Sequence, residues 1–291
     1  MIPLRSLEDH IFQVRDVQNE LDGFFISDET IPMGIVDKPH RSAFFAINIT
    51  MRGYAYLKCN LKEYEVKPHS IVLVPPQVVR YWENRSEDYL ALKIFFTEDF
   101  FQRGGSLINL SALPFFKPEA TNVFDIDDEA YFRLTLIFKI MRDKLTLPHE
   151  GMEDILRHYL NVLFLEIEEL YKKIEVPVED TPKSRGLILL DKFKKLVAEN
   201  YLTERSVSAY AQMLFISPTH LSNTIKEVSG KTPTEIIQEM IILDAQVMLR
   251  QTTKPINEIA DYLGYSDSSY FGKFFKKLTR MSPVTYRLNN K

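Results

Sequence analysis

Short runs of branched and aromatic residues, separated by turn signals, dominate residues 24–100. Five of these runs have the apolar density typical of β-strands, and they cover residues 44–50, 54–59, 71–74, 78–83 and 89–96. Turn-forming sequences stand between them at 51–53, 67–70 and 75–76. Several short strands at this spacing predict a β-sandwich or a β-barrel.

Two longer stretches with a helical repeat follow the strands. The first covers residues 127–145 and begins with acidic residues, which suit a helix N-terminus. The second covers residues 151–174 and carries apolar side chains at near-helical spacing. This second helix fits either pairing with a copy of itself or packing on the strands. We expect residues 125–175 to form a helical dimerisation segment.

The character of the chain changes near residue 176. Residues 176–182 hold two prolines and two acidic residues and show no periodicity, which is typical of a linker. We therefore predict a first domain over residues 1–175, a linker over 176–183 and a second domain over 184–291. After residue 184 the pattern indicates helices alone, so the fold class is predicted as α+β with two domains.

An internal repeat organises the second domain. The segment AYAQMLFIS at 209–217 aligns with EIADYLGYS at 258–266, and LSNTIKEVSGKTP at 221–233 aligns with FGKFFKKLTRMSP at 271–283. Each copy indicates a helix, a turn and a second helix, closed by Thr-Pro or Ser-Pro. The sequence therefore predicts two helix-turn-helix units.

The second helix of each copy has one apolar and one polar face. Ser217 and Pro218 suit the start of the first of these helices. Its apolar stripe is Leu221, Ile225 and Val228, and the matching stripe of the later copy is Phe271, Phe275 and Leu278. The outward positions are small or basic: Thr219, Ser222, Asn223 and Lys226 in the first copy, and Ser269, Gly272, Lys273 and Lys276 in the second. Such a face can enter the major groove of DNA, where Lys meets phosphate or guanine.

The charge distribution supports a nucleic-acid partner for the second domain only. The whole chain has a net charge of −4. Residues 183–291 carry 16 Lys and Arg against 10 Asp and Glu, a net charge of +6, which leaves −10 on the rest. A basic domain joined to an acidic one is expected when one domain alone meets phosphate.

The run PINEIADYLGYSDSSYFGKFFKKLTRMSPVTYR at 255–287 closely resembles the C-terminal signature of the AraC/XylS family of transcription regulators. The resemblance is strong over 184–291 and weaker over the β-rich part, which looks like the cupin-like sensor barrel common in that family. It implies a regulator of double-stranded DNA that functions as a homodimer, responds to a small-molecule effector and can contact RNA polymerase. Base contacts would come from Thr219, Ser222, Asn223, Ser268, Ser269 and Lys273, with Lys226 and Lys276 beside them. Two linked recognition helices would enter major-groove segments about 34 Å apart.

The sequence departs from the family pattern at several positions. A basic residue is common in that family near Met240 and at the positions of Gln246 and Val247, and a glycine is common at the position of Arg280. These departures predict a modest affinity for DNA that depends on dimerisation or on salt.

Five residues on or beside the predicted strands are candidates for an effector pocket: His40, Phe44, Tyr54, Arg80 and Trp82. The aromatic members equally fit a plain hydrophobic core, and Trp82 could plug the barrel. The alternative to an effector domain is a ligand-independent dimeric regulator or architectural protein. A closed cavity of several hundred Å³ with convergent polar groups would favour the effector.

Catalysis is not expected. The histidines before residue 140 are His10, His40 and His69, which are far apart and form no HxH pair, so a metal-dependent cupin enzyme is a remote alternative. No catalytic residue, metal site or cofactor is predicted. The single cysteine, Cys59, and the absence of a signal peptide or of a long apolar run lead us to expect a cytoplasmic protein without a membrane partner.

Overall fold

The computed structural model describes residues 20–28, 36–103, 108–117, 120–146, 149–174 and 182–289. These residues fall into two compact units, one formed mainly by the chain up to residue 176 and the other mainly by the chain after it. Most of the predicted linker lies outside the described residues. Helix α5 (Pro182–Asn200) begins within the predicted linker, two residues before the predicted start of the second domain, and its first residue is a proline, which is compatible with the first turn of a helix.

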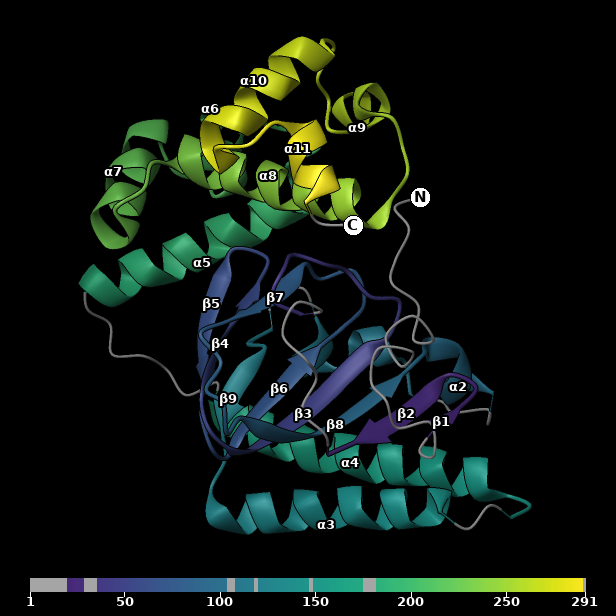
Figure 1. Ribbon diagram of the computed structural model, residues 1–291. Helices are drawn as coiled ribbons and strands as arrows, with labels where there is room; N and C mark the ends of the chain where they lie inside the picture. The colour runs from purple at the N-terminus through teal and green to yellow at the C-terminus, as the bar shows by residue number, and fades with distance from the viewer. Residues whose placement is uncertain are drawn as a thin grey trace. The chain divides into compact units, whose positions relative to one another are not determined.

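The N-terminal unit contains two antiparallel sheets (Figure 1). The larger has six strands in the order β1-β2-β8-β3-β6-β9, and the smaller has three in the order β5-β4-β7. The strands are β1 (Glu20–Leu21), β2 (Phe24–Ser27), β3 (Phe45–Arg52), β4 (Ala55–Cys59), β5 (Lys62–Val66), β6 (Ser70–Val74), β7 (Arg80–Glu83), β8 (Leu90–Phe96) and β9 (Val123–Asp125).

Side chains of the six-stranded sheet alternate between two hydrophobic cores. On β8, Ala91 and Phe95 belong to an inner core shared with the small sheet, whereas Ile94 and Phe96 belong to an outer core shared with helices. This alternation is the two-residue period of a β-strand. One sheet therefore has an inner face toward the other sheet and an outer face toward helices.

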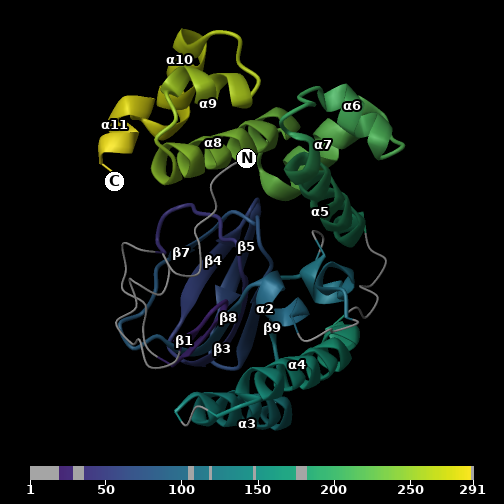
Figure 2. The same ribbon diagram turned by 90° about the vertical axis from the view of Figure 1, so that its right-hand side faces the viewer.

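Two long helices, α3 (Asp128–Leu145) and α4 (Met152–Ile174), lie side by side under the outer face (Figures 1 and 2). Arg133 of α3 donates to Glu166 of α4 at 3.2 Å. Shorter elements complete this layer: α2 (Glu98–Gln102), η2 (Leu110–Ala112) and η3 (Pro114–Phe116). Both long helices match the predicted helical stretches, and α4 packs on the β-domain through residues such as Leu163 and Leu170.

The C-terminal unit is helical, as predicted. Helices α6 and α7 form the first helix-turn-helix, α9 and α10 form the second, and the long α8 joins them. The bounds are α6 (Val207–Met213), α7 (Pro218–Ser229), α8 (Pro233–Gln251), α9 (Ile256–Tyr262), α10 (Ser268–Thr279) and α11 (Pro283–Leu288). Among the described helices of the whole chain, none has the length and apolar character needed to cross a membrane.

Candidate nucleic-acid interface

Helix α7 presents the polar face that the sequence predicts. The hydroxyl of Ser217 accepts the amide of His220 at 3.2 Å, and Pro218 occupies the first turn, which fixes where the helix begins. Leu221 and Ile225 are buried against the neighbouring helices. Because these two residues hold one face inward, the opposite face points to solvent; on it Thr219, Asn223 and Lys226 are exposed and Ser222 is half-buried.

Helix α10 repeats the arrangement with aromatic anchors. Phe271 and Phe275 are buried, and their rings lie 5.9 Å apart. The predicted outward residues Ser268, Ser269, Lys273 and Lys276 are all exposed. The apolar stripe is shorter than predicted, because Leu278 is 43% exposed at the last turn of the helix, where no other element covers its side chain fully.

Among the described residues, the eight predicted DNA-contacting side chains have no hydrogen-bond or ion-pair partner. Within the described part of the chain, none of them makes a hydrogen bond or an ion pair through its side chain with another residue; the amide of Ser269 donates to Asp267 instead. They are Thr219, Ser222, Asn223, Lys226, Ser268, Ser269, Lys273 and Lys276. Their polar groups can therefore bind an external molecule without first breaking a bond inside the protein.

Polar contacts link helices of the C-terminal unit that are distant in sequence. Arg205, which precedes α6, donates to the carbonyl of Leu263 in the second unit, and its guanidinium lies 4.4 Å from the ring centroid of Tyr265. Burial raises the pKa of Tyr265 to about 12, so this ring stays neutral beside the cation. The Tyr201 hydroxyl donates to the buried carboxylate of Asp244 on α8. The Arg205 contacts thus join the start of the first helix-turn-helix to the turn of the second, and the Tyr201 bond joins the segment after α5 to α8.

The departures from the family pattern on α8 concern mostly buried positions. Met240 and Val247 lie in the core of the helical unit, and Gln246 is half-buried. A basic side chain at Met240 or Val247 would be buried here rather than face a phosphate. The apolar residues at positions 240 and 247 therefore do not lower the exposed positive charge of the C-terminal unit.

Three of the five predicted effector residues line a small space between the two sheets. His40, Arg80 and Trp82 border a cavity of about 40 Å³. Phe44 is buried beside it, with the guanidinium of Arg80 at 5.2 Å from its ring centroid. Arg80 also donates to the hydroxyl of Ser42 at 2.7 Å. The cavity has the volume of roughly one water molecule, so its own side chains fill most of the interior.

The structure does not place Tyr54 in this cavity. Its side chain is 55% exposed, because Tyr54 directly precedes β4, where Ala55, Leu57 and Cys59 are the inward positions, and so it shares the outward side with Tyr56 and Lys58. Sequence reasoning missed two buried polar residues of the cavity, Asn48 on β3 and Lys93 on β8. Each is a polar residue flanked by apolar residues within a strand run, and this pattern could have identified both as candidate pocket residues from the sequence.

The histidines do not converge. His40 borders the inner cavity, whereas His69 contacts Asp128 at 3.1 Å and stacks on Tyr131. His10 lies outside the described residues. Over the described ranges, no three His, Cys, Asp or Glu side chains gather where they could hold a metal ion.

Two family models match the chain. Residues 32–112 match an AraC-like ligand binding domain, and residues 210–289 match a helix-turn-helix domain. The first region contains the inner cavity, and the second contains α7 and α10. Each match thus covers part of one of the two units.

Curated proteins similar to this chain include three transcription regulators. The bifunctional transcriptional activator/DNA repair enzyme AdaA of Bacillus subtilis is 29% identical over 120 residues, which is 41% of this chain and 56% of that protein. The HTH-type transcriptional activator RhaR of Salmonella dublin is 26% identical over 143 residues, or 48% and 51%. The arabinose operon regulatory protein of Escherichia coli is 20% identical over 271 residues, or 87% and 83%. The chain thus spans about half the length of the first two.

Proposed function

Because this chain belongs to the AraC family of transcription regulators, we propose that it binds specific double-stranded DNA sequences and controls transcription from them. The observation that carries the proposal is the pair of matched helices, α7 and α10, whose eight outward polar side chains make no hydrogen bond or ion pair within the described chain.

On both helices, small polar side chains and lysines have different roles in DNA recognition. Small hydrogen-bonding residues such as Asn223 and Ser269 allow close approach to base edges, and Asn can bond adenine through two atoms. Lys273 reaches guanine or phosphate, while Lys226 and Lys276 serve as phosphate contacts. Because helix α8 joins the two units within one chain, the two recognition helices would enter neighbouring major-groove segments, so the DNA site would have two half-elements about one helical turn apart.

Selection from a random DNA library tests this proposal. Wild-type protein should enrich one motif with two such half-elements. The double variant Asn223→Ala with Lys273→Ala should lose about 1–3 kcal/mol of binding free energy per base contact removed, and should tolerate changes at the contacted bases.

The matched control is Lys192→Ala, which removes an exposed lysine of α5 outside both recognition helices. It should retain the motif and nearly all the affinity. Unchanged affinity and motif in the Asn223 and Lys273 double variant would contradict the assigned contacts.

For the N-terminal unit we propose a small-molecule effector that acts through His40, Phe44, Arg80 and Trp82, joined by Asn48 and Lys93. The lining is rich in cationic and polar groups, which favours a polar or anionic compound. Such an effector would have to displace side chains, since the cavity holds about 40 Å³.

The same small volume supports a second candidate, a ligand-independent regulator whose N-terminal unit serves only to dimerise. Exposed apolar residues on the long helices, including Phe132, Val162 and Leu165, favour a homodimer that forms through α3 and α4. The two candidates differ in one measurable respect: only the first predicts that a metabolite changes the affinity for DNA.

The remaining parts of the proposal follow from a regulatory role. The protein would function in the cytoplasm, where DNA is accessible, with RNA polymerase as a further partner. It would have no catalytic activity. Detectable turnover of a substrate that depends on His40 or Arg80 would contradict this last statement.

A further inference from the structure

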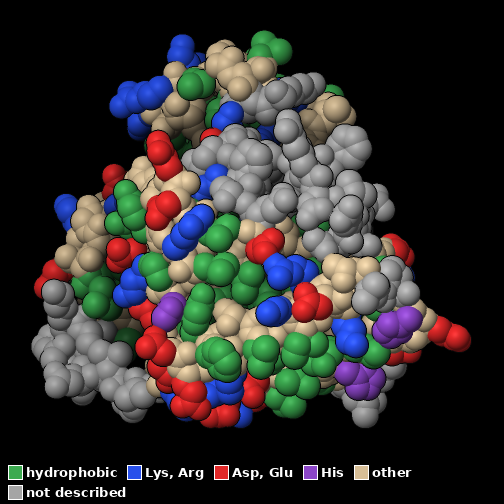
Figure 3. Space-filling model, turned by 60° about the horizontal axis from the view of Figure 1, so that its bottom comes forward, with side chains coloured by type: hydrophobic (Ala, Val, Ile, Leu, Met, Phe, Trp, Pro, Cys, Tyr) green, Lys and Arg blue, Asp and Glu red, His purple; other side chains and the backbone are tan. Residues whose placement is uncertain are grey.

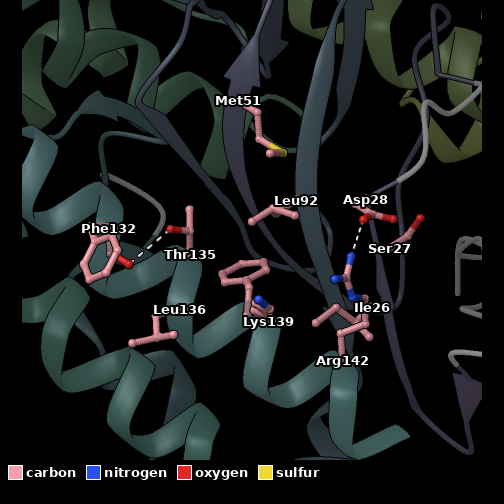
Figure 4. Close-up of a pocket in the computed structure, with 11 residues that line it drawn as sticks. Ile26, Ser27, Asp28, Met51, Leu92, Phe132, Thr135, Leu136, Lys139 and Arg142 are labelled. Carbon is pink, nitrogen blue, oxygen red and sulfur yellow. Dashed lines mark hydrogen bonds and ion pairs between the residues drawn. The ribbon is translucent and has the colours of Figure 1, made fainter. Parts of the chain in front are cut away.

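A groove of about 420 Å³ lies between α3 and the outer face of the six-stranded sheet (Figure 4). The strands contribute Ile26, Met51 and Leu92, and the helix contributes Phe132, Leu136 and Lys139. The volume lies within the range of small-molecule sites, roughly 300–1,000 Å³. The groove is distinct from the inner cavity, because Leu92 faces it while the adjacent Lys93 faces the interior between the sheets.

Most of the groove surface is apolar and part of it is open to water. Helix α3 covers the sheet through Leu134, Phe138 and Met141, but leaves Met51 and Leu92 at the sheet margin only partly covered. Phe132 and Leu136, one helical turn apart on α3, are 68% and 46% exposed. Green apolar side chains are visible in Figure 3, where the side of the unit bearing α3 comes forward. An apolar molecule that fills the groove would remove this surface from water.

Charged groups lie along one stretch of the groove. Arg142 pairs with Asp28, so these two charges compensate each other (Figure 4). Lys139 is exposed, and within the described ranges no carboxylate pairs with it. The hydroxyl of Thr135 donates to the carbonyl of Tyr131 at 2.7 Å, which leaves Lys139 as the available donor. The groove therefore combines a long apolar surface with one uncompensated positive charge.

We propose that this groove binds a small amphipathic anion, with the apolar chain against Met51, Leu92 and Leu136 and the anionic head on Lys139. The net positive charge selects an anion over a neutral or cationic amphiphile. The concave shape and the volume fit one small molecule. A second copy of the chain pressing Phe132 against this face is the competing occupant. The site does not depend on the DNA-binding role of the C-terminal unit.

Calorimetric titration of the full chain with decanoate, below its micelle-forming concentration, tests the site. We expect saturable binding of one decanoate per chain and none of decyltrimethylammonium. The variant Lys139→Glu should weaken decanoate binding by about tenfold or more, because it replaces a charge-assisted contact by repulsion. Lys144→Glu makes the same charge change on α3 outside the groove lining and should leave the affinity unchanged.

A second pair of variants tests the apolar part. Leu136→Glu introduces a carboxylate at an already exposed position of the groove and should also reduce decanoate binding, whereas Ile174→Glu, at an exposed position at the end of α4, should not. The proposal is overturned if decanoate shows no saturable binding, or if Lys139→Glu binds it as well as wild type. It is also overturned if Leu136→Glu only dissociates a dimer and leaves decanoate binding intact. DNA binding by the same samples reports separately on the C-terminal unit.

Discussion

At the scale of single residues, the two helix-turn-helix copies differ in where they place glycine. The turn between the helices has a left-handed residue in both copies: Phe215, with φ of 57°, in the first and Gly264, with φ of 73°, in the second. After the recognition helix the order is reversed, with Gly230 at 69° and Arg280 at 66°. A side chain in this region costs about 1 kcal/mol or more relative to glycine. Each copy therefore carries one strained position.

The substitution Phe215→Gly should stabilise the C-terminal unit. The side chain is 95% exposed, so its removal forfeits little packing, and glycine relieves the left-handed strain of about 1 kcal/mol. The larger entropy of the unfolded chain offsets part of this gain. Thermal unfolding should show a Tm higher by a few degrees. Arg280→Gly is the matched test at the other strained position and should act in the same direction.

The reciprocal change provides the control. Gly264→Ala should lower the Tm, since its φ is +73° and an added Cβ would lie 3.0 Å from the Nη2 of Arg205. A lower Tm for Phe215→Gly would mean that the exposed ring contributes stability, against the assignment of strain.

At the scale of elements, the joining helix α8 has a stronger N-terminal cap than its counterpart α11. Thr232 and Glu235 form a reciprocal pair in which the amide of Thr232 donates to the Glu235 carboxylate at 2.7 Å. In the second copy the corresponding residues are Ser282 and Thr285, and the hydroxyl of Ser282 alone accepts an amide. The hydrogen bonds from the backbone and side chain of Thr232 lower the pKa of Glu235 below its ordinary value. The first copy therefore has a pH-dependent cap and the second does not.

The stability of the C-terminal unit should depend on pH through the Glu235 carboxylate. A lowered folded-state pKa contributes stability above the unfolded pKa of about 4.3, and this contribution is lost as pH falls through the lower folded-state value. Glu235→Gln preserves an acceptor but does not titrate. The Tm of wild type should exceed that of Glu235→Gln near neutral pH, and the difference should shrink as the medium is acidified. Thermal unfolding over a pH series measures it; a constant difference would contradict the assignment.

Sequence periodicity predicted most elements because each has a strong apolar pattern. The five strand runs correspond to β3, β4, β6, β7 and β8, and the repeat located both helix-turn-helix units. Strand β5, with the sequence KEYEV, was missed because alternating polar residues hide a strand that is buried only at its end. The DNA contacts assigned to α7 and α10 stay predictions. Predictions of which side chains face inward and which face outward agree with the structure at most positions of both helices, where a 3.6-residue period separates buried from exposed positions. They were less successful in the barrel, because the face to which Tyr54 or Lys93 points depends on the pairing of strands distant in sequence.

At the scale of the whole molecule, the two faces of one sheet offer two different spaces to ligands. The inner face borders about 40 Å³ where cationic and polar side chains stand among apolar ones, and the outer face borders about 420 Å³ lined largely by apolar side chains. Neighbouring residues on β8, Leu92 and Lys93, serve the two spaces separately. Because side chains alternate along a strand, a single sheet separates the largely apolar groove from a cavity that contains several cationic side chains.

An effector of the inner space should therefore be recognisable by its dependence on Asn48. Among the described residues, its buried Oδ1 has no hydrogen-bond partner, so Asn48→Ala should change the Tm of the free protein little while it removes a ligand contact. A metabolite that binds there should stabilise wild type by about 2.7 kcal/mol at a hundred times its Kd. It should also change the DNA affinity, and it should do neither in Asn48→Ala. Lys139→Glu, on the other face of the sheet, should retain the full response.

If no compound in a broad library of polar metabolites alters either the Tm or the DNA affinity of wild type, the inner space is a plain core. The N-terminal unit would then act as the dimerising part of a ligand-independent regulator.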